Sequence, residues 1–188
     1  MIYIYDDFLP ENLFQVLKSY TDDGFQKVDM PGKSFWVKKT PDELVKLILK
    51  KLQIVEGKNI NNILCFIRQA KSNQDDEWRI HNDSIIEGQK PERALVYYIT
   101  SPDTELNGTA FWSHNKYGDT YPVDKDTTEF DRMLNEDANN MNLWTMKSLV
   151  GFKENRLLSY PCNYFHSKYP NKFQDSRVVL VMFYNFVV

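Results

Sequence analysis

The sequence predicts a mainly β fold with flanking helices, of the β-sandwich or jelly-roll type. From residue 61 onward, short segments rich in Val, Ile, Tyr and Phe alternate with polar turns, a spacing typical of an all-β domain. The gaps between them are mostly too short for the helices that an α/β fold needs. Aromatic residues make up 14% of the chain, which also favours strands. The expected strands are Ile63–Ala70, Trp78–Asp83, Ala94–Thr100, Thr109–Ser113, Ser148–Phe152, Arg156–Tyr160 and Arg177–Val187.

Residues 1–60 are expected to form a helical support for this core. A short strand over Met1–Tyr5 leads into a helix over Glu11–Tyr20, which has apolar residues at helical spacing. A strand over Ser34–Lys38 then precedes a second helix. This helix opens near Thr40, which is expected to cap it as part of a capping box.

We expect one domain over residues 1–188, because a chain of 188 residues can bury one substantial core and no linker or repeat divides it. Residues 61–188 would form the jelly-roll core, interrupted by a polar insertion at 114–147. A short helix over Thr127–Asn135, opened by Asp126, is expected within the insertion. Such an insertion is often a lid or binding loop, and a solvated decoration is the alternative.

The composition predicts a cytoplasmic protein that binds no membrane and is unlike nucleic-acid-binding proteins. The net charge is −3, so no overall basic field attracts a polyanion. The first residues carry acid instead of base and lack a long apolar run, so we expect no signal peptide. No segment approaches the roughly 20 apolar residues of a membrane helix. Cys65 and Cys162 are too few for a disulfide framework or a Cys-based zinc site and are expected to be buried thiols. The sequence does not predict the oligomeric state.

Histidine is scarce, so the placement of the three histidines, His81, His114 and His166, is informative. On a strand, residues i and i+2 point to the same face, so His81 and Asp83 are expected to present a nitrogen and an oxygen to one metal ion. His166, from a distant strand, would complete the two-histidine, one-carboxylate site that is diagnostic of non-haem iron(II) oxygenases. The alternatives are a surface hydrogen bond between His81 and Asp83 and a structural role for His166. His114 is interpreted as a loop histidine.

Arg177 begins the most apolar of the expected strands, eleven residues after His166. An arginine at the head of such a strand is costly if that end is buried without a partner. Its planar guanidinium suits a carboxylate held by two parallel hydrogen bonds. The alternative is a strand-end arginine in solvent.

Taken in order, these features resemble the prolyl 4-hydroxylase-like branch of the Fe(II)/2-oxoglutarate-dependent dioxygenases. The resemblance covers roughly residues 61–188. Its matching segments are His81-Asn82-Asp83, Val96-Tyr97-Tyr98-Ile99, Asn107-Gly108-Thr109-Ala110-Phe111, Phe152-Lys153-Glu154-Asn155-Arg156-Leu157-Leu158 and Arg177-Val178-Val179-Leu180. Two features depart from the family. Asn107 replaces the first of two glycines, and the spacing from His166 to Arg177 is a residue or two longer than is common.

The resemblance implies a double-stranded β-helix, the cupin-like form of the jelly roll, that holds Fe(II) through His81, Asp83 and His166. It also implies 2-oxoglutarate as co-substrate, with its distal carboxylate bound by Arg177 and Tyr97, and O2 as oxidant. The implied reaction is the hydroxylation of a peptide or small molecule that the sequence does not identify.

Further candidates for lining the substrate pocket are Arg68, Tyr98, Trp112 and Phe183. Two other functions stay open from the sequence. One is a non-catalytic jelly-roll module that binds a metal or ligand. The other is a cupin-like metalloenzyme that uses no 2-oxoglutarate.

Overall fold

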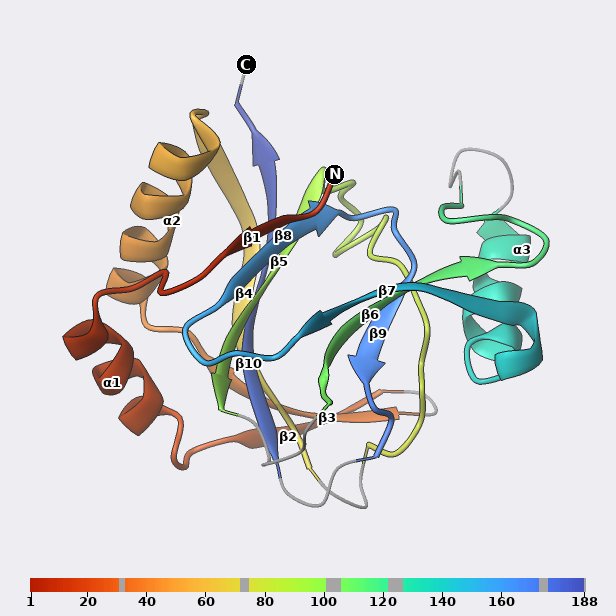
Figure 1. The fold of residues 1–188 in the computed structure, drawn as a ribbon, viewed down its shortest axis with the longest axis horizontal. Coiled ribbons are helices and arrows are strands. Elements are labelled where there is room, and N and C mark those ends of the chain that lie inside the picture. The colour runs from red at the N-terminus through yellow and green to blue at the C-terminus, as the bar shows by residue number, and fades with distance from the viewer. Residues whose placement is uncertain (31–32, 72–74, 101–105, 122–126, 173–175, 188) are drawn as a thin grey trace.

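Two antiparallel sheets form the body of the protein (Figure 1). The computed structural model describes residues 1–30, 33–71, 75–100, 106–121, 127–172 and 176–187. The strands are β1 (Tyr3–Tyr5), β2 (Gln26–Met30), β3 (Lys33–Lys39), β4 (Ile60–Ala70), β5 (Arg93–Thr100), β6 (Gly108–His114), β7 (Trp144–Gly151), β8 (Leu157–Pro161), β9 (His166–Tyr169) and β10 (Arg177–Phe186). The larger sheet has the order β1-β8-β5-β10-β4-β3-β2, and the smaller sheet has the order β7-β6-β9. The predicted mainly β jelly roll with flanking helices is confirmed.

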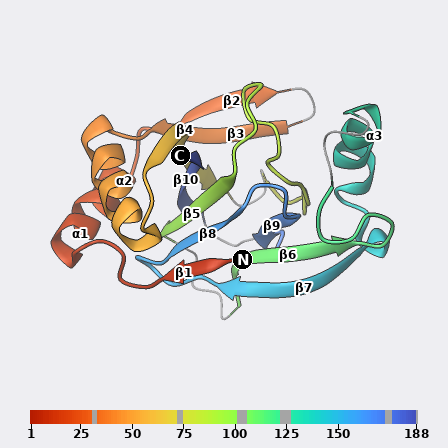
Figure 2. The same ribbon diagram turned by 90° about the horizontal axis from the view of Figure 1, so that it is seen from above.

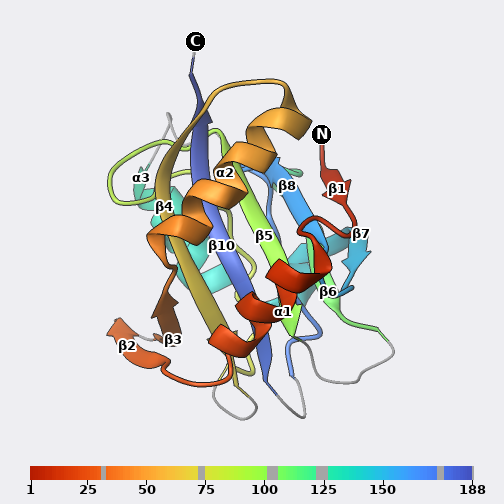
Figure 3. The same ribbon diagram turned by 90° about the vertical axis from the view of Figure 1, so that its left-hand side faces the viewer.

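Helices α1 (Glu11–Tyr20) and α2 (Asp42–Glu56) cover the outer face of the larger sheet (Figure 3). Each helix buries its apolar side against the sheet, α1 through Phe14 and Leu17 and α2 through Ile48 and Leu52. Seen from above, these helices lie at the opposite end of the molecule from α3 (Thr127–Arg132) (Figure 2). None of the helices within the described ranges combines the length and hydropathy of a membrane span.

The expected cap of α2 is wrong. Pro41 occupies the N-cap position and no side chain accepts a hydrogen bond there. Thr40 is buried instead, and its Oγ1 accepts a hydrogen bond from the Cys65 thiol at 3.5 Å. Cys65 and Cys162 are both free cysteines, and only Cys162 is fully buried.

The register of β10 determines which side chains face the second sheet. Val179 pairs with Tyr98 of β5, and Leu180 pairs with Tyr97. Successive residues of a strand point to opposite faces. Leu180 and Tyr97 therefore belong to the core beneath the helices, whereas Val179 and Tyr98 belong to the core between the sheets.

The segment expected as a strand over Trp78–Asp83 is not a strand. Its only ladder-type contact is an isolated bridge between His81 and His166. Arg79 has a φ of 46°, which breaks extended geometry. Strands β2 and β9 were not predicted.

The insertion at 114–147 packs against the smaller sheet. Its described part contains α3, a π-helical turn at Met133–Asp137 and a 3-10 turn at Met141–Leu143. Asp126, expected to open the helix, lies outside the described residues. The insertion and the adjoining segments share a buried apolar cluster of Ile80, Ala110, Trp112, Tyr121, Phe130, Met133, Trp144 and Phe165. The insertion therefore packs into the fold through a shared core and is not a solvated decoration.

A buried asparagine, Asn155, joins the N-terminal segment to β5. Its Nδ2 donates to the Leu9 carbonyl and its Oδ1 accepts from the Leu9 amide, both at 2.9 Å. The same Oδ1 accepts from the Tyr97 hydroxyl at 2.5 Å. With a φ of 61°, Asn155 is in a conformation that asparagine tolerates better than most residues.

We expect Asn155→Ala to lower the free energy of unfolding by about 3 kcal/mol, because the Leu9 amide, the Leu9 carbonyl and the Tyr97 hydroxyl lose a buried partner together. Tyr97→Phe removes one of these bonds and should cost about 1 kcal/mol. Urea unfolding followed by circular dichroism measures both. Equal losses in the two variants would contradict this role for Asn155.

Candidate metal centre

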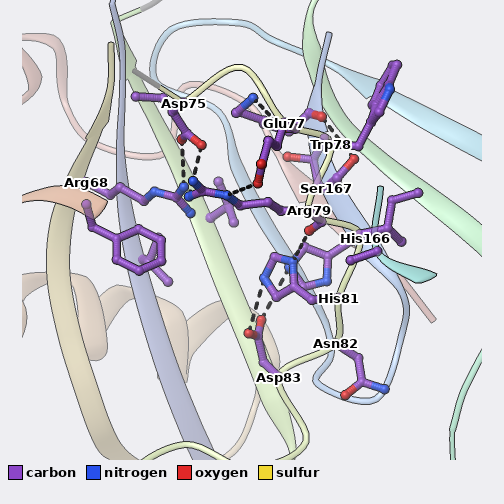
Figure 4. A pocket seen from close by; sticks show the side chains of 18 of the residues that line it. Arg68, Asp75, Glu77, Trp78, Arg79, His81, Asn82, Asp83, His166 and Ser167 are labelled. Carbon is purple, nitrogen blue, oxygen red and sulfur yellow. Dashed lines mark hydrogen bonds and ion pairs between the residues drawn. The ribbon is translucent and has the colours of Figure 1, made fainter. Parts of the chain in front are cut away.

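The three predicted metal ligands converge in one pocket (Figure 4). His81 and Asp83 lie between β4 and β5, and His166 begins β9. The Nε2 atom of His81 is 3.6 Å from Oδ1 of Asp83, and Nε2 of His166 is 3.3 Å from Oδ2. One ligand atom from each residue lies within 4.8 Å of the other two. Within the described ranges, no other group of His, Cys, Asp and Glu side chains meets this condition.

Main-chain hydrogen bonds bring the ligands together. The His81 amide donates to the His166 carbonyl at 3.1 Å, and the His166 amide donates to the His81 carbonyl at 2.8 Å. The Asp83 amide donates to the Cys162 carbonyl at 2.8 Å. The ligands therefore meet through backbone pairing with the β8–β9 region.

Each histidine is oriented by the carbonyl two residues before it. Nδ1 of His81 lies 2.7 Å from the Arg79 carbonyl, and Nδ1 of His166 lies 3.1 Å from the Tyr164 carbonyl. A carbonyl only accepts, so we assign the hydrogen to Nδ1 in both rings. This tautomer leaves the Nε2 lone pair of each ring free for a metal, the usual arrangement of metal-binding histidines.

The donor set fits a divalent metal ion. Two Nε2 lone pairs and one carboxylate face each other, an arrangement that needs a positive charge between them. His81 is a poor source of this charge by protonation, because partial burial and the neighbouring His166 lower its pKa. Two imidazoles and one carboxylate leave other coordination positions open, as in non-haem iron(II) sites.

Arg177 lies in the same pocket, at the head of β10. Its side chain is buried, and burial lowers the pKa of the guanidinium. Nη2 is 3.4 Å from Thr109 Oγ1, and Nε has no hydrogen-bond partner among the described residues. A buried cation of this kind is costly without an anion. The pocket, of about 550 Å³, therefore contains a buried cation that has no carboxylate partner among the described residues and that a carboxylate ligand would neutralise.

The structure corrects the choice of tyrosine. Tyr97 was expected beside Arg177, but it lies on the helix side of the sheet and donates to Asn155. Tyr98 is the tyrosine near Arg177, whose guanidinium lies 5.4 Å from its ring centre. The Tyr98 hydroxyl donates to Thr109 Oγ1 at 2.8 Å, so Tyr98 supports the residue that contacts Arg177.

Of the four residues expected to line the pocket, two line it and two do not, and Tyr98 is one of those that do not. Arg68 and Phe183 line the pocket, and Arg68 forms an ion pair of 2.8 Å with Asp75. Trp112 does not line it, contrary to expectation. Its ring is buried in the cluster shared with the insertion, and its Nε1 donates to Ser167 Oγ at 2.9 Å.

Tyr160 was missed by the sequence analysis. It lines the pocket from β8, and its ring centre is 4.8 Å from that of His166. Burial, and next the charge of Asp83, raise the pKa of its hydroxyl well above the usual value. Tyr160 therefore lines the same pocket as the candidate metal ligands and Arg177. The sequence did contain a signal for this position: Tyr160 follows Leu158 by two residues on an apolar strand, so both side chains point to the same face.

His114 is not a solvated loop residue. It is buried at the end of β6, and its Nε2 lies 3.3 Å from Asp137 Oδ2. Its ring stacks on Tyr117. His114 therefore belongs to the core of the insertion and lies apart from the metal ligands.

No family model matches the chain, and no curated protein matches it either. Solved structures do match. The non-haem α-ketoglutarate-dependent carbocyclase SnoK from nogalamycin biosynthesis aligns with 97% of this chain and 78% of its own, at a TM-score of 0.68 and 12% identity. HygX from Streptomyces hygroscopicus, with nickel and 2-oxoglutarate bound, aligns with 98% of this chain and 82% of its own, at a TM-score of 0.62 and 11% identity.

A Pseudomonas putida prolyl-4-hydroxylase aligns with all of this chain and 93% of its own, at a TM-score of 0.56 and 9% identity. This chain has the fold of the 2-oxoglutarate-Fe(II) oxygenases. The predicted resemblance is thereby confirmed for the fold. The likeness at such identities concerns the fold alone, and the roles of individual residues depend on the geometry described above.

We expect His81→Ala and His166→Ala to abolish the binding of Co(II) or Ni(II), because each variant removes one of three ligands. The third histidine provides the matched control: His114→Gln should bind the metal as the unmodified protein does. Isothermal titration calorimetry on the metal-free protein measures all three affinities. Loss of binding in His114→Gln alone would contradict this assignment.

Proposed function

We propose that this protein is an Fe(II)- and 2-oxoglutarate-dependent oxygenase that hydroxylates a peptide or a small molecule. The observation that supports this most strongly is that the His81, Asp83 and His166 cluster shares one pocket with the buried guanidinium of Arg177. The fold of the neighbouring structures is consistent with the proposal.

The charges of these groups match a dicarboxylate. A divalent metal with Asp83 leaves one net positive charge, and Arg177 adds a second. 2-Oxoglutarate carries two negative charges at neutral pH, one for each end of this arrangement. A carboxylate at Arg177 would also satisfy the unpaired Nε through the two-bond geometry that a guanidinium favours.

In the proposed reaction His81, Asp83 and His166 hold iron(II), and Arg177 holds the distal carboxylate of 2-oxoglutarate. Bound iron(II) supplies the oxidising chemistry, in which O2, 2-oxoglutarate and a substrate C–H bond yield succinate, CO2 and an alcohol. The inner face of β10 contributes Val179, Val181 and Phe183 to the pocket. These apolar side chains would exclude water beside the co-substrate.

The substrate side of the pocket carries mixed charge. Four residues of the insertion, Leu134, Asn135, Ala138 and Asn139, line it together with Arg68, Asp75, Glu77 and Arg79. Two of the structural neighbours were solved with small molecules, hygromycin B in HygX and nogalamycin RO in the epimerase SnoN, whereas another is a prolyl-4-hydroxylase. Both a small molecule and a peptide therefore remain within the proposal.

We expect the anaerobic protein with Fe(II) to bind 2-oxoglutarate and to show a weak visible charge-transfer band. Arg177→Ala should raise the half-saturating concentration of 2-oxoglutarate roughly 100-fold, because two charge-assisted hydrogen bonds of about 1.5 kcal/mol each are lost. Arg177→Lys retains the charge without the planar, two-bond geometry of a guanidinium, and its half-saturating concentration should lie between those of the unmodified protein and Arg177→Ala.

Succinate formation in air decides between the proposal and its alternatives. A non-catalytic module would bind metal and release no succinate with any candidate substrate. A cupin-like enzyme without 2-oxoglutarate would show no band, and Arg177→Ala would leave its activity unchanged. Either result would contradict the proposal, provided that calorimetry shows the metal site to be filled.

The two neighbouring tyrosines give an internal comparison. We expect Tyr98→Phe to weaken 2-oxoglutarate binding about 5-fold, because Thr109 loses a hydrogen bond of about 1 kcal/mol and with it part of its orientation toward Arg177. Tyr97→Phe should leave this affinity unchanged, since Tyr97 lies on the other face of the sheet. Titration of the charge-transfer band measures both, and a larger effect in Tyr97→Phe would contradict the corrected assignment.

A further inference from the structure

We propose that the insertion positions the metal ligand His81, and that Asn139 does so by fixing the backbone of Arg79. This inference rests on the metal site of the proposed function. The segment that carries His81 has no strand ladder on the side of Arg79 and Ile80. Other contacts must therefore determine where the His81 ring points.

Arg79 is the residue through which the ring is oriented. Its carbonyl accepts the Nδ1 hydrogen of His81 at 2.7 Å, so the direction of this carbonyl sets the direction of the imidazole. With a φ of 46°, Arg79 has a left-handed conformation that is unfavourable for a long side chain. Such a conformation persists where the surroundings hold it in place.

Both the backbone amide and the side chain of Arg79 have partners. Its amide donates to Oδ1 of Asn139, in the insertion, at 2.9 Å. Its guanidinium forms ion pairs with Asp75 at 3.2 Å and Glu77 at 3.1 Å (Figure 4). The side-chain partners come from the same segment of chain. The guanidinium also lies 5.6 Å from the ring centre of Phe35 in β3, but Asn139 is the partner that connects the Arg79 backbone to a different part of the fold.

The next residue, Ile80, attaches the same segment to the insertion a second time. Its amide donates to the Ala138 carbonyl at 3.0 Å. Its side chain is fully buried in the cluster that contains Phe130, Met133 and Trp144 of the insertion. Residues 79 and 80 therefore both depend on the turn at Ala138 and Asn139.

This turn is itself anchored by Asp137. The Asp137 carbonyl accepts from Trp144 Nε1 at 2.8 Å, and its carboxylate forms an ion pair of 3.2 Å with Arg132. The anchoring favours a fixed support over a lid. The order of contacts runs from the insertion to Asn139, then to the Arg79 backbone, then to His81. Asn139 is a positioning residue, because it is not one of the three candidate ligands and acts on His81 through the Arg79 backbone.

Asn139 permits a direct test because its side chain is exposed and its removal should leave the fold intact. We expect Asn139→Ala to weaken Co(II) binding about 10-fold, as measured by calorimetry, the lower end of the effect of removing a partner of a metal ligand. Asn139→Asp keeps an acceptor oxygen at the Oδ1 position and should bind Co(II) within about 3-fold of the unmodified protein, a difference of less than 1 kcal/mol.

Asn135→Ala is the matched control, since Asn135 also lines the pocket but donates to the Asp131 carbonyl within the insertion. It should bind Co(II) normally. The melting temperature of the metal-free protein separates positioning from folding, and Asn139→Ala should leave it within about 2 °C, which corresponds to a change of roughly 0.5 to 1 kcal/mol for a chain of this length.

Normal Co(II) binding by Asn139→Ala would overturn the inference, and so would equal weakening in Asn139→Asp. A fall in the melting temperature parallel to the loss of affinity would overturn it as well, because the effect would then be one of stability. Absence of Co(II) binding by the unmodified protein would overturn the metal site itself, and with it the proposed function. The two failures are therefore distinguishable.

Discussion

The pair of main-chain hydrogen bonds between His81 and His166 is the interaction on which the candidate site depends. It joins two segments that are far apart in the sequence, and no other ladder contact holds His81. On the other side, His166 pairs with Phe111 of β6, so one ligand is part of a sheet. The candidate metal site extends the smaller sheet by a single residue, His81, and Asp83 adds the carboxylate.

Burial of charge on the inner face of the larger sheet is the second constraint. The side chains of β10 that line the pocket are apolar except for Arg177, which the sheet buries without a carboxylate partner among the described residues. Such a group reduces the stability of the ligand-free fold. A ligand that binds the folded state and not the unfolded state restores stability through mass action. The arrangement therefore favours a protein whose stability increases when metal and dicarboxylate are bound.

The sequence predicts which segments are helices and strands well, but it predicts less well to which face of a sheet a given side chain points. Helix α1 has the expected bounds, and the expected strand at Arg177 is β10 to within a residue. The error at Tyr97 arises because side chains alternate with period two, so facing depends on the register of β5 against β10. That register shifts between Val178 and Val179, at an irregularity that no local pattern indicates. The prediction that Trp112 lines the pocket is wrong for a related reason, since the insertion covers the face of β6 to which Trp112 points.

The two histidine ligands use the same local device but are supported unequally. Each donates Nδ1–H to the carbonyl two residues earlier, Arg79 for His81 and Tyr164 for His166. Tyr164 lies in the short connection between β8 and β9, where its amide bonds to Pro161 and its bridge to Thr120 adds a further contact. Arg79 instead has a strained backbone, and the insertion supplies its amide partner. Thr120 also belongs to the insertion, so both histidines depend on contacts with it, but His166 is held in addition by the ladder between β9 and β6.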